Sequence, residues 1–461
     1  MKPAWIAVDI GAESGRVVRG ELSDHHLVTE EVHRFKNTPR RNRWDLELLS
    51  SETLSGVRQA LPAMSVGVDT WGVDFVRMNR HGAVENPRQY RDPRNPGAME
   101  AYLRRFSRSG IYDHTGVQFL PFNTLFQFEA QGWLECRQVL LMPDYLHWVL
   151  TDGRAWGIER TNAITTQMVD ARAGDWWLGA DPFGWRGALP QIIEPGTKIG
   201  RFEDLDVIAP CTHDTASAIV AVPITNKKSA WISSGTWSIL GIEIPEPVIS
   251  ERSFALNFTN EGGYGCTRLC KNCSGMWLIQ QCRRAWKAGS YAELTAQAAA
   301  ATTPASHFDP DHADFLADSP DMPERIAGVI TSLGLVAPTT HASLIRLILE
   351  SLALKYRHIL GELRELSPTP IEQIHVVGGG SQNVLLNQLT ADITGLPVIA
   401  GPVEATAIGN LLVQMIATGH VANLDEGRAL VARSFPTTTF SPKPDRDWDK
   451  LYSDFVARNQ L

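Results

Sequence analysis

The sequence has few cysteines, no excess of positive charge and no long apolar run. Six cysteines in 461 residues are too few to form the framework of a disulfide-dependent fold, and a chain of this length does not need one. The 43 lysines and arginines are outnumbered by 51 aspartates and glutamates, so the formal net charge is −8, which argues against a dedicated nucleic-acid binder. No segment approaches the ~18 apolar residues that a transmembrane helix needs.

Length and composition are those of an ordinary globular protein. A hydrophobic share of 43% and a charged share of 20% exclude a disordered chain, and 461 residues suit two or three domains. The first residues run directly into a strand-like segment without the apolar stretch of a signal peptide, so we expect a cytoplasmic protein with reduced thiols. Its partner is expected to be a small molecule rather than a nucleic acid or a membrane.

Two segments share the pattern of a strand, a turn of small and polar residues, and a second strand. The first covers residues 5–22 and the second covers residues 230–244. This pattern predicts a β-hairpin whose turn presents backbone N–H groups. Its repetition suggests two similar domains, and the turn-rich stretch 181–206 is the expected junction between them.

Strands and helices alternate through the rest of the chain, which predicts an α/β fold with mixed sheets. Helices are expected at residues 45–61, 124–135, 344–366 and 382–393 and after residue 405, and strands at residues 65–70, 374–377 and 397–400. The glycine triplet 378–380 stands between a strand and a helix, where a nucleotide can approach a backbone that has no Cβ in the way.

Asp9 stands at the end of the first strand, directly before the turn that leads to Ser14, Gly15 and Arg16. A carboxylate in this place can hold Mg²⁺ through water, the turn amides can bind phosphate oxygens, and Arg16 can neutralise their charge. The alternative is that Asp9 is an ordinary turn residue. The second turn, which holds Thr236, favours phosphate binding, because two such turns could hold one nucleotide between them.

His213, Asp214 and Thr215 precede a run of small and apolar residues that predicts a helix. An aspartate in this place is either an N-cap or a general base aimed at a hydroxyl group, near the positive end of the helix. An aspartate carboxylate, whose ordinary pKa is ~3.9, is a weak base. Phosphoryl transfer through a loose transition state nevertheless needs mainly orientation and late proton acceptance.

Trp71, Gly72 and Asp74 come together just after a predicted strand. An aromatic ring, a glycine and a carboxylate in one place can stack on a sugar face and bind its hydroxyl groups. The chain has 14 tryptophans, most of which we expect to serve packing, so packing is the alternative role of Trp71.

Cys266, Cys270 and Cys273 have the spacing C-x3-C-x2-C of the cluster-binding cysteines in radical S-adenosylmethionine enzymes. Three thiolates in this arrangement could hold an iron–sulfur cluster. The alternative is three buried or half-buried thiols without a metal. The sequence alone does not decide whether any of the three pair as disulfides.

Eight motifs stand in collinear order across nearly the whole chain. They are AVDIGAESGR at 7–16, DTWGVDF at 69–75, QFLPFNTL at 118–125, LMPDY at 141–145, HDTASA at 213–218, SSGTWS at 233–238, TNEGG at 259–263 and GPVEA at 401–405. Together they strongly resemble the motifs of the FGGY carbohydrate kinases, and the resemblance runs from Ile6 to about Pro442.

The resemblance implies an α/β fold of two actin-like ATPase domains, ribonuclease H-like in topology, with a cleft between them. Residues 1–205 are expected to be the N-terminal domain, with the sugar site and the first phosphate turn. Residues 206–461 are expected to be the C-terminal domain, with the base, the second phosphate turn and the adenosine site. The implied reaction is phosphoryl transfer from ATP, with Mg²⁺, to O1 of a ketose.

The family's motifs also imply roles for individual residues. Asp214 would accept the proton of the sugar hydroxyl, and Asp9 would hold the metal. The implied ATP contacts are Ala12, Glu13, Ser14, Gly15, Arg16, Thr236, Gln280 and Gly380. The implied sugar contacts are Gly72, His213, Asp214, Thr215 and Asn272.

The sequence departs from the family pattern in two places and leaves several questions open. Glu13 replaces a usual serine and adds negative charge near the phosphates, and cysteines surround Asn272 where apolar residues are usual.

L-rhamnulose is the expected substrate, with L-fuculose, L-ribulose or D-xylulose as alternatives, and a monomer or small homo-oligomer is expected. A non-catalytic sugar sensor is the alternative of another class, although the presence of Asp9, Asp214 and Thr236 argues against it.

Overall fold

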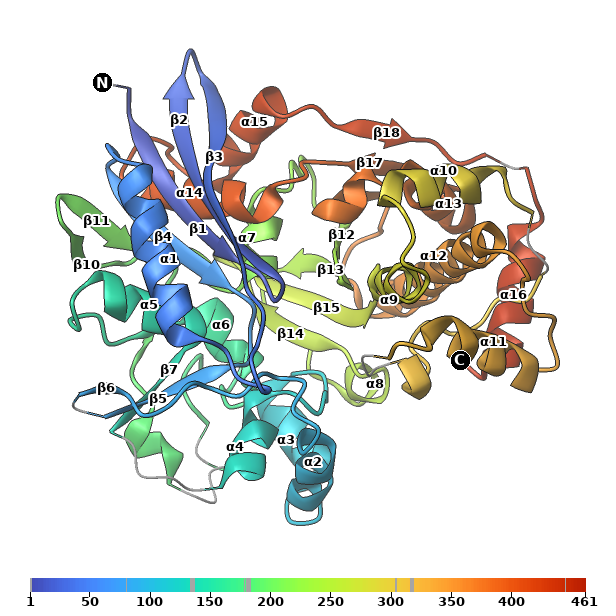
Figure 1. Ribbon diagram of the computed structural model, residues 1–461, viewed down its shortest axis with the longest axis horizontal. Coiled ribbons are helices and arrows are strands. Elements are labelled where there is room, and N and C mark those ends of the chain that lie inside the picture. The colour runs from blue at the N-terminus through green and yellow to red at the C-terminus, as the bar shows by residue number, and fades with distance from the viewer. Residues whose placement is uncertain are drawn as a thin grey trace. The chain divides into compact units, whose positions relative to one another are not determined.

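The computed structural model, drawn as a ribbon in Figure 1, describes residues 2–79, 81–132, 137–177, 179, 184–302, 305–315, 319–443 and 445–461. The chain forms two compact units. Unit 1 consists of Met1–Thr225, Glu243–Leu269 and Glu404–Phe435, and unit 2 of Asn226–Ile242, Cys270–Val403 and Pro436–Leu461. These bounds differ from the predicted division at residue 205, because the strand β11 (Leu205–Ile208) belongs to a sheet of unit 1. The functional division into two domains stays a prediction.

Unit 1 is built on a six-stranded sheet with the strand order β10-β11-β4-β1-β2-β3. The strands of this sheet are β1 (Ala4–Ile10), β2 (Ser14–Ser23), β3 (His26–Lys36), β4 (Ser65–Thr70), β10 (Lys198–Phe202) and β11. The unit's other strands are β5 (Phe75–Asn79), β6 (Gly82–Ala83), β7 (Gln138–Leu141), β8 (Ile158–Glu159), β9 (Ile192–Ile193) and β14 (Thr259–Gly262).

The helices of unit 1 come from all three of its chain segments. They are α1 (Leu46–Gln59), α2 (Asn95–Leu103), α3 (Arg108–Thr115), α4 (Thr124–Gln131), α5 (Met142–Leu150), α6 (Arg160–Thr165), α7 (Asp214–Val220), α8 (Glu251–Ala255), α14 (Ala405–Ala417) and α15 (Leu424–Ser434). The predicted helix at 45–61 is α1. It begins after Asp45, the N-cap residue, whose side chain accepts a hydrogen bond from the N–H of Leu48. The predicted helix at 124–135 is α4, and Glu135 lies outside the described residues.

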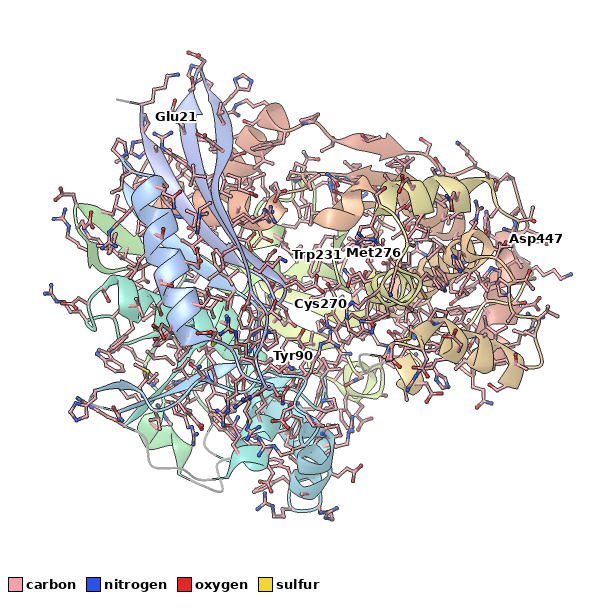
Figure 2. The ribbon with its side chains drawn as sticks, viewed as in Figure 1. Glu21, Tyr90, Trp231, Cys270, Met276 and Asp447 are labelled. Atoms are coloured by element: carbon pink, nitrogen blue, oxygen red, sulfur yellow. The ribbon has the colours of Figure 1, made fainter. Side chains whose placement is uncertain are left out.

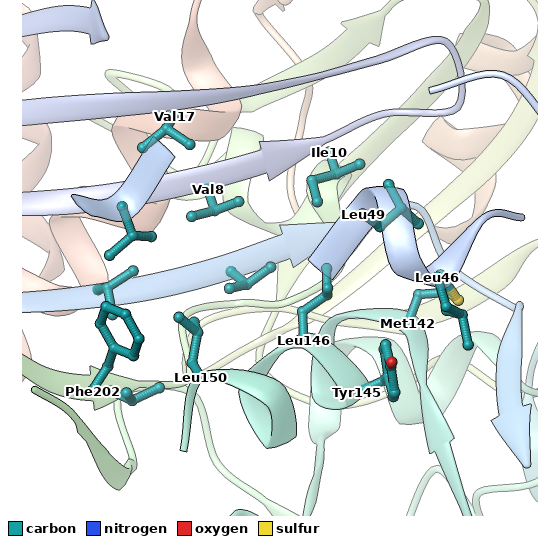
Figure 3. Close-up of a cluster of buried hydrophobic side chains, with 14 of the residues drawn as sticks. Val8, Ile10, Val17, Leu46, Leu49, Met142, Tyr145, Leu146, Leu150 and Phe202 are labelled. Carbon is teal, nitrogen blue, oxygen red and sulfur yellow. The ribbon is translucent and has the colours of Figure 1, made fainter. Parts of the chain in front are cut away.

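The two faces of β1 have different roles because side chains alternate along a strand. Ile6, Val8 and Ile10 point into an apolar core that α1 and α5 complete, and Figure 3 shows part of this cluster with Leu49 and Leu146. The side chains of β1 that alternate with these three face α14, which contacts both β1 and β4. The sheet of unit 1 is therefore covered on both faces.

Unit 2 has its strands in the order β15-β13-β12-β16-β17-β18. The strands are β12 (Ser229–Ser234), β13 (Trp237–Ile244), β15 (Thr267–Ser274), β16 (Gln373–Val377), β17 (Val398–Ala400) and β18 (Thr438–Phe440). The end of β13 from Glu243 and the start of β15 up to Leu269 are counted with unit 1. The helices are α9 (Trp277–Trp286), α10 (Tyr291–Ala300), α11 (Met322–Ser332), α12 (His341–Leu366), α13 (Val384–Thr394) and α16 (Trp448–Asn459).

The predicted internal repeat is confirmed. β1 pairs antiparallel with β2 and parallel with β4, and β12 likewise pairs antiparallel with β13 and parallel with β16. Each unit thus holds a β-hairpin whose first strand also has a parallel neighbour. Both strands and helices occur in each unit, which confirms the predicted α/β class. Within the described part of the chain, no helix is both long enough and apolar enough to cross a membrane.

Candidate active site

The carboxylate of Asp9, near the end of β1, forms a two-point ion pair with Arg16 of β2. Nε and Nη2 of Arg16 donate to Oδ2 of Asp9 at 2.9 and 2.6 Å, and the two residues stand opposite each other in the strand register. Nη1 of the same guanidinium pairs with Glu404, at the start of α14. Burial opposes the charge of Arg16, but the carboxylates of Asp9 and Glu404 outweigh it and raise the pKa of Arg16.

Three carboxylates of unit 1 act on one another here. Asp69 stands beside Asp9 on the parallel strand β4, and Asp214 is the first residue of α7. Burial, and after it the negative charge of Asp9, raises the pKa of both Asp69 and Asp214, the latter to about 7. The side-chain amide of Asn410 in α14 donates to Asp69 at 2.5 Å. Negative charge is therefore concentrated at this place, and a cation or a proton would relieve it.

The carboxylate of Asp214 is held by its two chain neighbours. The N–H and hydroxyl of Thr215 donate to Oδ1 of Asp214 at 2.6 and 3.2 Å, and Nε2 of His213 lies 3.5 Å from the same oxygen. The N-cap of α7 is His213, so the alternative that Asp214 is only the N-cap is wrong. Its side chain is 30% exposed. A partly exposed carboxylate with a pKa of about 7 can accept a proton near neutral pH.

His213 belongs to a buried polar group with Glu261 and Arg268. Nη2 of Arg268 donates to Oε2 of Glu261 at 2.9 Å and lies 3.3 Å from Nδ1 of His213. Burial, together with the positive charge of Arg268, lowers the pKa of His213 well below its usual value. The imidazole is therefore neutral near pH 7, and it can take part in hydrogen bonds without adding charge.

The predicted sugar contact Gly72 follows the end of β4. Thr70, the last residue of β4, forms a parallel bridge with His213, and its N–H donates to the carbonyl of Thr212 at 2.9 Å. The segment that carries Gly72 therefore starts beside the residues that precede Asp214. The structure thus brings His213, Asp214 and Thr215 beside the end of β4, two residues before Gly72.

Trp71 and Asp74, in the same segment, are turned into the protein. Asp74 is 1% exposed, and its two carboxylate oxygens accept hydrogen bonds from four protein groups. The expectation that Asp74 binds sugar hydroxyls directly is therefore wrong, since protein donors already use both of its oxygens. Trp71 is 6% exposed and its ring centre lies 4.3 Å from that of Trp44, which supports the packing role for this tryptophan.

The predicted phosphate contacts before Arg16 form the turn between β1 and β2 and the start of β2. The N–H of Gly11 closes the turn by donating to the carbonyl of Ser14 at 2.9 Å. Gly15 is buried under Phe35, and a Cβ at Gly15 would lie 2.2 Å from a ring carbon. Ala12 and Ser14 are half-buried, and Glu13 is exposed.

The predicted nucleotide contacts of unit 2 also lie together. Nε2 of Gln280, in α9, donates to the hydroxyl of Thr236 at 3.3 Å. The glycine triplet packs against Ser234, two residues before Thr236: a Cβ at Gly380 would lie 1.9 Å from the Ser234 hydroxyl oxygen. Gly378 has a φ of +81°, a conformation that favours glycine.

Asn272 lies on β15, in unit 2, whereas the other predicted sugar contacts lie in unit 1. Its neighbour Lys271 forms an ion pair with Glu362 of α12 at 2.7 Å. Lys271 therefore makes its ion pair within unit 2. The role of Asn272 as a sugar contact stays a prediction.

The cysteine motif does not form a cluster site. Cys270 and Cys273 are both buried in β15, the first of them marked in Figure 2, and residues three apart in a strand point to opposite faces of the sheet. Cys266 lies before the strand, with its thiol 3.6 Å from Glu243. None of these three described cysteines takes part in a disulfide. The iron–sulfur alternative is therefore wrong, because these thiols cannot converge on one cluster.

Sequence reasoning missed roles for Asp69, Asn410 and Glu404. Asp69 and Glu404 lie within the motifs DTWGVDF and GPVEA, but no local pattern indicates a partner for either of them. The presence of an aspartate as the last residue but one in two predicted strands, each followed by a turn, could have indicated Asp69. Nothing in the sequence connects Asn410 with a residue 341 positions away.

Comparison with known proteins gives the same family as the motifs. A model of the FGGY family of carbohydrate kinases, C-terminal domain, matches residues 230–418. A rhamnulokinase of Bacteroides thetaiotaomicron is 40% identical to this chain, over 99% of each of the two chains. A rhamnulokinase of Pectobacterium carotovorum is 39% identical, over 99% of this chain and 96% of that protein.

The fold has solved counterparts as well. The glycerol kinase of Plasmodium falciparum, whose crystal structure was determined with ADP, superposes with a TM-score of 0.78 at 15% identity, over 100% of this chain and 99% of that one. The expected two-domain α/β architecture is confirmed by this likeness. The chain therefore belongs to the FGGY family of carbohydrate kinases, in which it groups with the rhamnulokinases.

Proposed function

We propose that this chain transfers the γ-phosphoryl group of ATP to O1 of L-rhamnulose and produces L-rhamnulose 1-phosphate and ADP. The observation that carries the proposal is the partly exposed carboxylate of Asp214, with a pKa of about 7, at the start of α7 and under the influence of Asp9. The choice of sugar is supported by relatives named rhamnulokinase that match almost the whole chain at about 40% identity.

Asp214 is assigned the role of base. The hydrogen bonds from Thr215 fall on Oδ1, so Oδ2 is the atom that we assign to receive the O1 proton. O1 forms a bond to the γ-phosphorus while the bond between that phosphorus and the bridging oxygen of ADP breaks. Neutral His213 borders the base and can hydrogen-bond a sugar hydroxyl, a role that we extend to Gly72, Thr215 and Asn272.

The phosphates of ATP are assigned to two turns and one guanidinium. In unit 1 these are the turn Ala12, Glu13, Ser14 and Gly15, together with Arg16. In unit 2, Thr236, Gln280 and Gly380 are assigned to the nucleotide, and their mutual contacts support a common role. The exposed carboxylate of Glu13 lies in the first turn, where only its backbone is assigned to ATP.

The residues around Asp9 fit a magnesium ion. Mg²⁺ keeps several waters and takes one or two carboxylates, so it does not require a cage of protein ligands. The hydrogen bonds from Arg16 fall on Oδ2 of Asp9, so Oδ1 is the oxygen that we assign to the ion or to its water. When bound, the ion neutralises phosphate charge and favours attack at phosphorus.

A ketose panel tests the substrate. Coupled ADP release is measured with L-rhamnulose, L-fuculose, L-ribulose and D-xylulose, and we expect kcat/KM to be at least about tenfold higher with L-rhamnulose. A higher value for another ketose would reassign the substrate and leave the family unchanged. Sugar binding without ADP release would instead support a sensor.

A pair of variants tests the base. Asp214→Asn is expected to lower kcat by at least about 100-fold, because the amide cannot accept the proton. Asp206→Asn is the matched control, since the Asp206 side chain is 31% exposed and pairs with Lys198 on the neighbouring strand. Turnover of Asp214→Asn within a few fold of the wild type would show that Asp214 is not the base.

A cytoplasmic protein that is a monomer or a small homo-oligomer is also part of this proposal. Activity in the soluble fraction of cells, together with the mass measured by light scattering in solution, tests both statements. Recovery of the protein from membranes, or a large assembly, would contradict them.

A further inference from the structure

The turn at Val73, which follows β4 near the proposed sugar site, has a strained backbone. Val73 has a φ of +70°, which is unfavourable for any residue with a Cβ and most of all for a β-branched one. The N–H of Asp74 donates to the carbonyl of Gly72 at 2.9 Å, so the three residues form a γ-turn of the rare form with positive φ at its centre. Such strain persists only where surrounding contacts hold it, and it gathers at binding sites.

Contacts from two helices hold this turn. Thr165 at the end of α6 accepts the N–H of Val73 at 3.1 Å through its hydroxyl, and the same hydroxyl oxygen would lie 3.0 Å from a Cβ at Gly72. The hydroxyl of Thr124 and Nε2 of Gln127, both on α4, donate to the carbonyl of Val73 at 2.6 and 3.2 Å. Both polar groups of the Val73 backbone are therefore fixed.

The carboxylate of Asp74 ties these contacts into one buried cluster, which we name the Asp74 clamp. Its Oδ2 accepts the indole N–H groups of Trp44 and Trp71 at 2.6 and 2.9 Å and the backbone N–H of Tyr90, a residue marked in Figure 2, at 3.1 Å. Its Oδ1 accepts Nε2 of Gln127 at 2.9 Å. One carboxylate thus connects four segments of unit 1 around the turn.

The clamp is a costly arrangement for stability alone. All four donors are neutral, and a buried carboxylate loses its hydration without gaining an ion pair. This cost and the strain at Val73 occur in adjacent residues, directly after the strand whose end bridges to His213. Stability alone explains neither feature, whereas a function of the turn accounts for both.

We propose that Asp74 is a positioning residue for sugar binding, which holds the turn at Val73, and with it Gly72, in the conformation that receives the ketose. The inference rests on the proposed function in that it assumes a ketose bound beside Gly72. It goes beyond that function by assigning the recognition geometry to a residue that the sugar does not touch. Loss of the clamp should weaken sugar binding and leave nucleotide binding unchanged.

Two clamp variants and one control test this role. Asp74→Asn removes the charge and presents an amide donor where an acceptor is needed, and Trp44→Phe removes one donor while the carboxylate remains. Trp176→Phe is the control, because Trp176 is also buried in unit 1. This substitution likewise removes one indole hydrogen bond, the one that Trp176 donates to the carbonyl of Pro190 at 2.7 Å. Initial rates give KM for ketose and for ATP, and urea unfolding gives stability.

We expect Asp74→Asn to raise KM for the ketose at least about tenfold while KM for ATP stays within about twofold. Trp44→Phe should raise the ketose KM by about threefold or more, and Trp176→Phe should change neither KM although its stability falls as well. Equal effects on both KM values, or equal ketose KM values for Trp44→Phe and Trp176→Phe, would overturn the proposal. If Asp74→Asn does not fold, the comparison of Trp44→Phe with Trp176→Phe still tests the positioning role.

The test separates this proposal from the proposed function. The variants are assayed with whichever ketose of the panel the wild type phosphorylates, so a different substrate leaves the comparison valid. A wild type that phosphorylates no ketose would end the proposed function itself, and with it the sugar site to which the clamp is assigned.

Discussion

Gly409 of α14 lies directly against the carbonyl oxygen of Ser217 in α7. A Cβ at position 409 would stand 1.7 Å from that oxygen, a distance that no side-chain movement relieves because the contact is with backbone. Two residues further along α7, the carbonyl of Ile219 accepts a hydrogen bond from Arg428 at 3.0 Å. Since α7 begins with Asp214, the packing of these helices positions the proposed base.

Gly409→Ala is expected to lower both stability and turnover. The two helices must move apart, which we expect to cost about 2 kcal/mol or more and to reduce kcat. Gly361→Ala in α12 is the control, because a Cβ there meets nothing within 4 Å and alanine favours a helix. Urea unfolding and kcat are measured for both variants. Unfolding of Gly409→Ala at the wild-type urea concentration would contradict the close helix contact.

The dependence of kcat/KM on pH should report Asp214. Burial, and after it the charge of Asp9, raises its pKa to about 7. Only the ionised carboxylate can accept the O1 proton, so kcat/KM should fall about tenfold per pH unit below that pKa and level off above it. Rates measured from acid to mildly alkaline pH give the profile. A profile that is flat across neutral pH would show that no group with this pKa acts as the base.

Arg16→Lys should weaken the use of MgATP. Lysine cannot reproduce the planar two-point pairing with Asp9, so we expect KM for ATP to rise about tenfold and the Mg²⁺ requirement to increase. Arg19→Lys is the matched control on the same strand, where Arg19 pairs with Glu21 at 3.0 Å.

The same assay includes metal removal. EDTA should abolish activity and excess Mg²⁺ should restore it. Equal KM values for ATP in the two lysine variants would show that the Arg16–Asp9 pair is not part of the nucleotide site.

Glu350→Gln should destabilise unit 2. Glu350 is 1% exposed and accepts hydrogen bonds from His307, Arg346 and Arg446 at 2.8, 2.7 and 3.0 Å. Burial opposes its charge, but the hydrogen bonds of His307 and Arg346 outweigh it and lower the pKa of Glu350 to about 2. Loss of the charge leaves the guanidinium of Arg346, which is only 17% exposed, without its buried carboxylate, so we expect a cost of about 3 kcal/mol at pH 7.

The sign of the pH effect follows from the lowered pKa. Stability from Glu350 is fully present above the unfolded value near 4.5 and is lost as pH falls toward about 2, so wild type and Glu350→Gln should converge in acid. Glu372→Gln removes an exposed pair with Lys228 and is expected to change stability by less than about 0.5 kcal/mol. Unfolding curves at several pH values measure both, and equal losses in the two variants would contradict the expectation.

Much of the fold could be predicted from local patterns. The strand at 65–70 is β4, the helix at 344–366 lies within α12, and the strand at 374–377 lies within β16. The predicted helix at 382–393 is α13, which begins at Val384 because a 3-10 turn at Gly379–Gln382 precedes it. These features depend on residue periodicity and turn chemistry, which act over a few positions.

The candidate site could be predicted only where a motif carries it. Within unit 2 the predicted nucleotide contact Gln280 lies against Thr236, and within unit 1 the predicted sugar contacts His213 and Thr215 lie against Asp214, as their motifs imply. Asp74 shows the limit of such reasoning, because its residue type suggested a ligand contact while its burial assigns it to the interior. A carboxylate looks the same in a sequence whether it faces solvent or four protein donors.

The sequence by itself determined the α/β class, the repeated hairpin and the family, since these depend on short-range patterns and on collinear motifs. Only the tertiary structure decided which distant residues meet: Asp9 with Asp69, Asp69 with Asn410, and Arg16 with Glu404. Strand register and helix packing set these contacts, and both are properties of the assembled sheet and its covering helices. The charge around the proposed base follows from that assembly, because burial and neighbouring carboxylates, rather than residue type, raise its pKa.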